Sequence, residues 1–304
     1  MCRLLRFAGL LTAVTTLSFG ASTVIRTPGA TVPVYRLKLD PFLASPTHLV
    51  GLIVKARVNN GPPLRLLLDS GANMITVDPR AAAKSNCTGG TDLDLVGAGA
   101  QAAAGVKQVR AATIEIGALV LRDLSVLISD RFIAEGVQGV LPLSAFSGFL
   151  IRLDVPGKTL DLLPYPAAPP DRSDSLQALS NNNLLFIRGT VNERRDGYFL
   201  LDTGASYSAL SRTLARELNI SEALAQRVPL QAGTTEFDAP LVTSGVRFRF
   251  GTSELVPGAV VAVDLSLSSR YHNLDISGLL GFPALSGSVL VVNYRDRLVR
   301  IGSR

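Results

Sequence analysis

A seven-residue phrase occurs twice in this chain. It reads LLLDSGA at residues 66–72 and FLLDTGA at residues 199–205. The two aspartates, Asp69 and Asp202, are 133 positions apart, and the 17 residues before each of them align without a gap. A fixed offset of this kind predicts an internal duplication. Each aspartate follows an apolar run and precedes a small hydroxyl residue and a glycine, so we expect a buried strand to end in a tight turn that presents the carboxylate to a cleft.

A second pair of matching segments follows the aspartates. Residues 136–142 read GVQGVLP and residues 275–281 read DISGLLG, so Gly139 aligns with Gly278 at an offset of 139. Each half therefore has its own aspartate turn and its own glycine-bearing element. A Pro-rich and then polar stretch separates the halves, which is typical of a linker. We predict lobes at residues 51–163 and 184–304, with a linker at 164–183.

The composition indicates a mostly β protein. The chain of 304 residues is 47% hydrophobic and has 27 Gly, 17 Pro and no Trp, which favours short strands around a substantial core. Residues 52–58 and 64–68 flank the sequence NNGP and predict a hairpin that delivers Asp69. Three further short strands are expected at residues 112–116, 119–121 and 124–128.

Two short helical segments are also expected. Pro79 follows Asp78 and fits the first position of a helix that runs through residues 81–84. Leu210, Leu214 and Leu218 recur every four residues, which predicts an apolar helical face packed on the core.

The first residues have the layout of a secretory signal, with a basic start, an apolar stretch and small residues near 18–21. We expect residues 1–22 to be a signal peptide, so that the mature protein is extracytoplasmic, either periplasmic or secreted, without stable membrane insertion. A buried first strand and an uncleaved membrane tether are the alternatives. Residues 23–50 are expected to form an N-terminal extension with a strand at 34–39, and a pro-segment role for them stays open.

Charge and residue types argue against several other functions. The formal net charge is +6, and the Lys and Arg residues do not cluster, so no nucleic-acid partner is expected. His48 and His272 lack partners at ligand spacing, and Cys87 would be the sole cysteine after signal cleavage, so neither a metal nor another cofactor is predicted. Residues 204–208, GASYS, lack the closing glycine of a serine-hydrolase turn.

The two aspartates suggest acid–base chemistry if a pseudo-twofold axis brings them together. Two adjacent carboxylates do not both ionise easily, so they share a proton and titrate as a coupled pair. One can then act as a base on a water held between them, while the protonated partner donates to a carbonyl. Amide hydrolysis of this kind needs no metal and no covalent intermediate.

The residues next to the aspartates fit the same picture. The hydroxyls of Ser70 and Thr203 can bond across the axis to the opposite lobe and hold the pair rigid, or simply cap their own turns. Gly71 and Gly204 would let backbone amides approach the carboxylates.

A Gly/Ala-rich stretch is either a mobile hairpin over the cleft or a plain surface loop. Its central residues are Gly97, Ala98, Gly99, Ala100 and Gln101.

The sequence resembles the aspartic peptidases, specifically the retropepsin-like type with two tandem repeats in one chain. The resemblance rests on LLLDSGA and FLLDTGA, each followed by an element of the form VQGVLP or SGLLG. It implies two pseudo-symmetric, acid-protease-type β-barrel lobes in a pepsin-like bilobal arrangement, with the active-site cleft between them. It also implies that Asp69 and Asp202 are the catalytic dyad, that residues 96–108 form the flap, and that an extended polypeptide is the substrate of a monomer.

Two departures from that family are visible. Pro142 stands where the second copy has Gly281, which changes the loop that packs behind the first aspartate. If the site is impaired, the weakness is expected in the first lobe. The predicted flap has no tyrosine. Because the sequence also lacks pepsin-like disulfides and acidic charge, we expect an aspartic endopeptidase that does not work at strongly acidic pH. A catalytically inactive peptide-binding protein of the cell envelope is the alternative, and a purely structural envelope domain would leave the paired aspartates unexplained.

Overall fold

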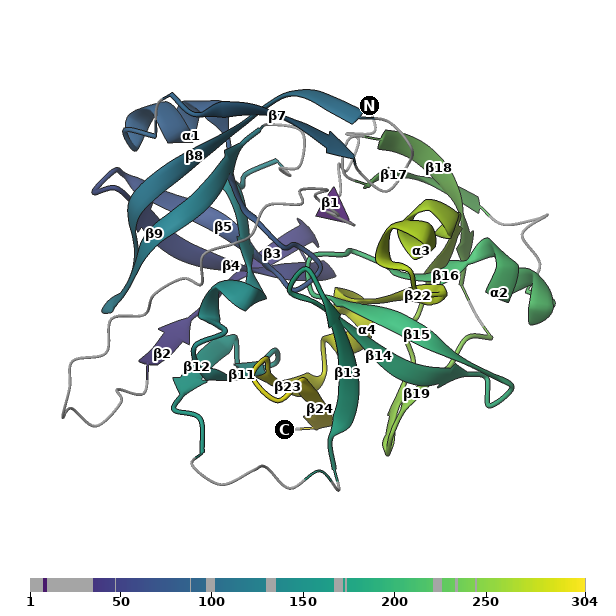
Figure 1. Cartoon of the computed structure of the whole chain (residues 1–304). Coiled ribbons are helices and arrows are strands. Elements are labelled where there is room, and N and C mark those ends of the chain that lie inside the picture. Colours follow the sequence, from purple (N-terminus) through teal and green to yellow (C-terminus); the bar gives the residue numbers. More distant parts are fainter. Residues whose placement is uncertain are drawn as a thin grey trace.

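The computed structural model has two lobes above a shared layer of strands (Figure 1). It describes residues 8–9, 35–46, 48–87, 89–96, 102–129, 135–166, 172, 174–220, 226–232, 235–243 and 245–303. Most of the predicted signal peptide and the predicted flap tip, residues 97–101, lie outside these ranges. Of the first 22 residues, only Ala8–Gly9 are described, as the short strand β1, which pairs in parallel with β17.

The N-terminal lobe is built on a sheet with the strand order β3-β4-β5-β10-β6-β9-β8-β7. An additional pairing of β4 with β8 closes the sheet towards a barrel. The strands are β3 (Asp40–Ser45), β4 (His48–Val58), β5 (Pro63–Asp69), β6 (Ile75–Val77), β7 (Thr91–Val96), β8 (Ala102–Ile116), β9 (Leu119–Ile128) and β10 (Gly139–Pro142). The two strands predicted at 119–121 and 124–128 are thus one continuous strand, because β9 pairs with β8 along its whole length.

The C-terminal lobe repeats the central part of this arrangement. Its strands are β14 (Leu184–Val191), β15 (Arg195–Asp202), β16 (Ser208–Ser211), β17 (Gln226–Ala232), β18 (Thr235–Val242), β19 (Phe248–Phe250), β20 (Ser253–Leu255), β21 (Val260–Val263) and β22 (Ile276–Gly281). They form the run β17-β18-β21-β16-β22-β15-β14, with β19 and β20 paired beside β14.

A layer of strands joins the lobes in the order β13-β24-β23-β11-β12-β2. Its members are β2 (Tyr35–Lys38), β11 (Leu150–Asp154), β12 (Thr159–Leu163), β13 (Leu176–Asn181), β23 (Ser288–Asn293) and β24 (Leu298–Ser303). The strand predicted at 34–39 is therefore confirmed as β2. The range predicted as a linker ends in β13, and the N-terminal extension also contains β3, which pairs with β4.

The hairpin before each aspartate has the same turn chemistry. Asn59 and Asn60 both have positive φ, at 46° and 61°, and the Gly61 amide donates to the Val58 carbonyl at 2.7 Å. Asn192 and Glu193 repeat the conformation, with φ of 51° and 57°. Two consecutive residues with positive φ make the turn that matches the twist of paired strands, and asparagine tolerates this conformation well. The predicted hairpin β4–β5 is confirmed.

The helices are short (Figure 1). They are α1 (Pro79–Lys84), α2 (Arg212–Glu217), α3 (Ser266–His272), α4 (Phe282–Leu285) and a 3₁₀ turn, η1 (Leu143–Phe146). The helix predicted after Asp78 is confirmed, and the Asp78 side chain caps it by accepting from the Ala81 amide at 2.7 Å. The helical face predicted from Leu210 is wrong in part, because Leu210 lies in β16 and α2 begins only after the N-cap Ser211.

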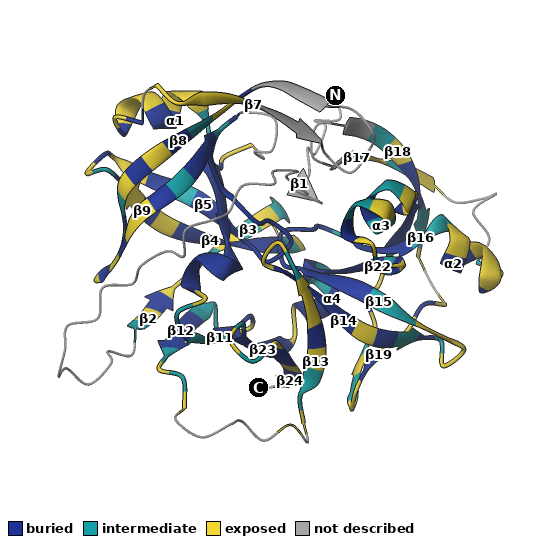
Figure 2. Cartoon of the chain, in the orientation of Figure 1, coloured by how far each residue is buried: buried dark blue, intermediate teal, exposed yellow. Residues whose placement is uncertain are grey.

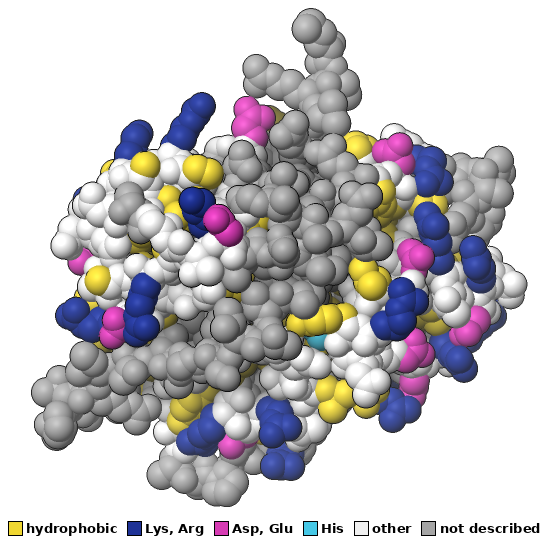
Figure 3. All heavy atoms as spheres, turned by 45° about the horizontal axis from the view of Figure 1, so that its top comes forward, with side chains coloured by type: hydrophobic (Ala, Val, Ile, Leu, Met, Phe, Trp, Pro, Cys, Tyr) yellow, Lys and Arg dark blue, Asp and Glu magenta, His cyan; other side chains and the backbone are white. Residues whose placement is uncertain are grey.

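The core runs through both lobes and the layer that joins them. Figure 2 shows buried strands where the lobes meet and alternating buried and exposed residues towards the outside. One large apolar cluster includes Leu68, Phe199 and Leu290, so it links all three parts. On the face seen in Figure 3, Lys and Arg side chains are interspersed with Asp and Glu. The expectation that no nucleic acid binds stays a prediction.

Candidate active site

The two aspartates of the repeated phrase lie together between the lobes. Asp69 is the last residue of β5 and Asp202 the last residue of β15. Both are buried, with 3% and 0% of their surface exposed. Since each strand ends at its aspartate, the chain leaves the sheet at the same point in both lobes, and the pseudo-twofold relation brings the two carboxyls into contact.

Crossed hydrogen bonds hold the two turns against each other. The Ser70 hydroxyl donates to the Leu201 carbonyl at 2.8 Å, and the Thr203 hydroxyl donates to the Leu68 carbonyl at 3.0 Å. Each hydroxyl also accepts from the amide of the other residue, at 3.0 Å in both directions. The bonding across the axis that the sequence suggests for Ser70 and Thr203 is therefore present. Both hydroxyls bond to the opposite lobe, so they do more than cap their own turns.

The glycines of the phrase make room for the carboxyls. The Gly71 amide donates to Asp69 Oδ1 at 2.7 Å, and the amides of Gly204 and Ala205 donate to Asp202 Oδ1 at 3.1 and 2.9 Å. A Cβ on Gly71 would lie 2.6 Å from both carboxylate oxygens of Asp202, and one on Gly204 would meet the Asp69 carboxyl in the same way. Only glycine at these positions lets each turn pack against the opposite carboxyl.

Burial and proximity raise the proton affinity of the pair. Burial raises the pKa of Asp69 to about 6, although the amide of Gly71 and the hydrogen bond with Asp202 oppose the rise. Burial, the charge of Asp69 and the hydrogen bond between the two side chains raise the pKa of Asp202 well above its ordinary range. Asp202 Oδ2 is buried and has no donor among the described N–H and hydroxyl groups. A proton held between the carboxyls satisfies that oxygen.

The element behind each aspartate is a short strand inserted into the sheet. β10 pairs in parallel with β5, so that Pro142 opposes Asp69, and β22 pairs with β15, so that Gly281 opposes Asp202. The register is the same in both lobes despite the change from glycine to proline. The Gly281 amide donates to the buried hydroxyl of Ser208 at 3.0 Å.

The first lobe lacks both partners of that bond. Ile75 stands six residues after Asp69, as Ser208 does after Asp202, and Pro142 has no amide hydrogen. A missing donor at Pro142 is thus matched by a missing acceptor at Ile75. The expected weakness of the first lobe therefore finds no support in the contacts of Pro142. The role of Ser208 was not recognised from the sequence, where its only signal is a hydroxyl opposite a glycine 73 residues later.

The predicted flap is a hairpin in its described part. β7 and β8 pair in antiparallel fashion, with Thr91 opposite Gln108 at one end and Val96 opposite Ala102 at the other. Gly97, Ala98, Gly99, Ala100 and Gln101 connect these strands and lie outside the described residues. A second hairpin, β17–β18, is the corresponding element of the C-terminal lobe.

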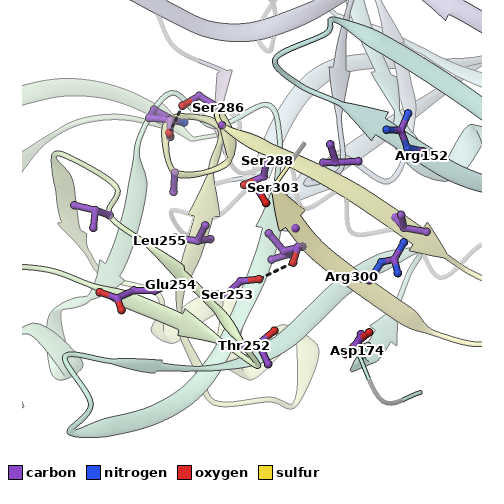
Figure 4. A pocket seen from close by; sticks show the side chains of 18 residues that line it. Arg152, Asp174, Thr252, Ser253, Glu254, Leu255, Ser286, Ser288, Arg300 and Ser303 are labelled. Atoms are coloured by element: carbon purple, nitrogen blue, oxygen red, sulfur yellow. Dashed lines mark hydrogen bonds between the residues drawn. The ribbon is translucent and has the colours of Figure 1, made fainter. Parts of the chain in front are cut away.

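A groove of about 940 Å³ lies away from the aspartates, on the solvent face of the joining layer (Figure 4). Arg152, Val291 and Arg300 occupy one row of its floor, since Val291 pairs with both arginines. Ser253 lies at its side and donates to the Ile301 carbonyl at 2.5 Å. Neither aspartate lines this groove, so it is separate from the candidate active site.

Two kinds of feature are absent from the residues that the structure describes. Within these ranges no three His, Cys, Asp or Glu side chains are grouped as a metal site would require. None of the described helices has the length and apolar character needed to cross a membrane.

Comparison with known proteins agrees with the geometry of the site. The family model described as aspartyl protease matches residues 54–145 and 187–284, one segment in each lobe and together more than half of the chain. Among solved structures, the aspartic proteinase from Irpex lacteus is similar in fold, with a TM-score of 0.55 and 12% sequence identity over 89% of this chain and 97% of that one. No curated protein sequence matches significantly. The matched segments contain both aspartate turns and both strands behind them, and the chain therefore belongs to the aspartyl protease family.

Proposed function

We propose that this protein is an aspartic endopeptidase that hydrolyses peptide bonds with Asp69 and Asp202. The observation that carries the proposal is the pair of buried carboxyls in hydrogen-bonding contact, held by the crossed bonds of Ser70 and Thr203. A rigid pair of this kind favours a state with one shared proton, which supplies an acid and a base at one place.

Either carboxyl can have either role, because burial raises the pKa of both and the two share one proton. The ionised carboxyl acts as the base on a water held between them. The protonated carboxyl donates its proton to the oxygen of the scissile carbonyl as the water oxygen bonds to the carbonyl carbon and the tetrahedral intermediate forms. The carboxyl that took the proton of the water then passes it to the amine nitrogen as the C–N bond breaks, and a hydroxyl of the intermediate gives its proton to the other carboxyl, which restores the starting state.

The substrate would be an extended polypeptide between the lobes. Strand pairing with the two flap hairpins would supply main-chain hydrogen bonds, and alternate side chains would face each lobe. Export from the cytoplasm and monomeric action, with the two lobes as an intramolecular pseudo-dimer, are part of the same proposal and derive from the sequence alone.

Activity is tested by incubating residues 23–304 with an unfolded polypeptide between about pH 3 and pH 8. The proposal expects an acid limb near pH 6, because below the pKa of Asp69 both carboxyls are protonated and no base remains. Asp69→Asn and Asp202→Asn should each abolish cleavage. Asp123→Asn, at an aspartate whose side chain is 68% exposed, serves as the matched control and should cleave normally.

The same assay separates the peptidase from the peptide-binding alternative. Binding of a fluorescein-labelled peptide from the same polypeptide is measured by anisotropy alongside cleavage. Retained binding without cleavage at any pH would favour an inactive peptide-binding protein and contradict the proposal. Cleavage that persists in both asparagine variants would move the activity to another site or to a contaminant.

A further inference from the structure

A small apolar cluster lies on the same face of the N-terminal sheet as Asp69. The cluster consists of Phe42, Ile53, Leu67 and Val137, and it is separate from the main core. Side chains alternate along a strand, so Leu67 and Asp69 point to one face of β5, while Leu66 and Leu68 point to the other and pack in the core. The cluster therefore belongs to the side of the sheet that carries the catalytic carboxyl.

The strand pairing places Phe42 at the Asp69 end of the N-terminal sheet. Ile53 on β4 pairs with Leu67 on β5 in antiparallel fashion, and β5 continues for two residues to Asp69. Phe42 on β3 pairs with Gly51, two residues before Ile53 on β4. Phe42 therefore lies at the end of the sheet where β5 reaches Asp69, and β4 lies between β3 and β5.

Gly51 has no side chain, which leaves the space above it to the phenyl ring of Phe42. A Cβ on Gly51 would lie 3.4 Å from Cδ1 of Phe42 and 2.8 Å from Cδ1 of Leu67. The ring of Phe42 thus leans over Gly51 to join Leu67. Phe42 is only half-buried, whereas Ile53 and Leu67 are 0% and 2% exposed. The ring is therefore the accessible edge of the cluster.

The C-terminal lobe does not repeat this arrangement. The position that corresponds to Gly51 is Leu184, which is fully buried, and its partner on β13 is Asn181. The Asn181 side chain donates to the His272 carbonyl at 3.2 Å. One lobe thus presents an aromatic ring over a glycine beside its aspartate, and the other presents a leucine and an amide. Phe42 and Gly51 both precede residue 54, where the family match begins.

We propose that Phe42 is a specificity-determining residue of this enzyme. Its ring forms an apolar wall for the substrate side chain that lies against the N-terminal lobe beside Asp69, and it limits the size of that side chain. The inference rests on the proposed peptidase function. The asymmetry between the lobes means that Phe42 acts on one side of the scissile bond only.

The test compares cleavage-site profiles of Phe42→Ala, Phe42→Leu and the unmodified protein on one mixture of unfolded polypeptides, read by mass spectrometry. Phe42→Ala should change residue preference on one side of the scissile bond. It should lower kcat/KM at least tenfold for the apolar side chains that the unmodified protein prefers there, mainly through KM, and accept larger ones. Phe42→Leu should keep the preference in weakened form, and it remains a usable variant if the alanine variant folds poorly.

The matched control is Leu43→Ala. Leu43 follows Phe42 on β3 and is 46% exposed, so its loss should leave the profile unchanged. An unchanged profile in a folded, active Phe42→Ala variant would overturn the inference while leaving the peptidase function intact. If the unmodified protein cleaves nothing, the proposed function fails, and the role of Phe42 is then tested by the anisotropy of labelled peptides. Equal affinity of the unmodified protein and Phe42→Ala for these peptides overturns the role of Phe42. Weaker binding to Phe42→Ala supports it.

Discussion

Replacing Asp69 by asparagine should change how the stability of the protein depends on pH. In the folded protein burial raises the pKa of Asp69 to about 6, while an aspartate in an unfolded chain titrates near 3.8. The folded state therefore holds a proton that the unfolded state releases between these values. A group of this kind stabilises the fold fully below pH 3.8, and that contribution is lost as the pH rises through 6.

The expected size follows from the same two values. One decade in proton affinity is worth about 1.4 kcal/mol, so the interval from 3.8 to about 6 corresponds to about 3 kcal/mol in the free energy of unfolding. The asparagine that replaces Asp69 would be uncharged at all pH values, and its side-chain carbonyl can still accept from the Gly71 amide. The stability of Asp69→Asn relative to the unmodified protein should thus increase by about 3 kcal/mol between pH 4 and pH 7.

Urea unfolding at pH 4, 5, 6 and 7, followed by far-UV circular dichroism, measures this difference, and the chain has no Trp to serve as a fluorescence probe. His272 titrates in both proteins and largely cancels in the difference. Asp202 does not cancel, because removing the charge of Asp69 lowers the pKa of Asp202, and this changes the difference in the same direction. Asp92→Asn, whose side chain is 80% exposed, is the surface control. The reasoning is refuted if the difference in free energy of unfolding between Asp69→Asn and the unmodified protein stays constant from pH 4 to pH 7. Ionising Asp69 in the folded protein would then cost no free energy.

Two other predictions concern the surroundings of the dyad. Thr203→Val removes a hydroxyl that donates to the Leu68 carbonyl and accepts from the Ser70 amide, so two buried groups lose their partner. We expect the free energy of unfolding in urea to fall by about 2–5 kcal/mol, whereas Thr203→Ser should stay close to the unmodified protein. Near-equal values for both variants would contradict the role of the crossed bonds. His272 packs on Phe186 at 5.0 Å between ring centroids, and burial lowers its pKa to about 4, so its own contribution to the free energy of unfolding should fall as the pH falls from 6.5 to 4. His272→Phe should lack that loss in the same pH series, and an imidazole that titrates near 6.5 by NMR in the folded protein would count against it.

Local sequence rules predicted the elements whose causes are local. The hairpin before Asp69 follows from two asparagines that accept positive φ, and α1 follows from the Asp78 cap and the proline after it. The Leu210 prediction failed for a different reason. A four-residue spacing fits both a helix and a strand followed by a helix, and the pairing of β16 with β21 and β22 decides between them.

The candidate site likewise combines features that the sequence predicted with features that only the strand pairing shows. The repeated phrase identified Asp69 and Asp202 and the residues that bond across the axis. The compensation of Pro142 by Ile75, and the bond from Gly281 to Ser208, depend on strands that approach from distant parts of the chain. Phe42 was not recognised either, because its relation to Asp69 passes through two strand pairings.

The sequence alone shows that the chain has two equivalent halves, each with a buried strand that ends at an aspartate, because duplication and strand alternation are patterns of residue order. Only the tertiary structure shows that the two aspartates form one coupled pair of buried carboxyls. Their pKa values depend on burial and on a carboxyl 133 positions away, and both are properties of distance in space. The asymmetry between Phe42 over Gly51 and Asn181 beside Leu184 likewise acquires meaning only when the strands are paired.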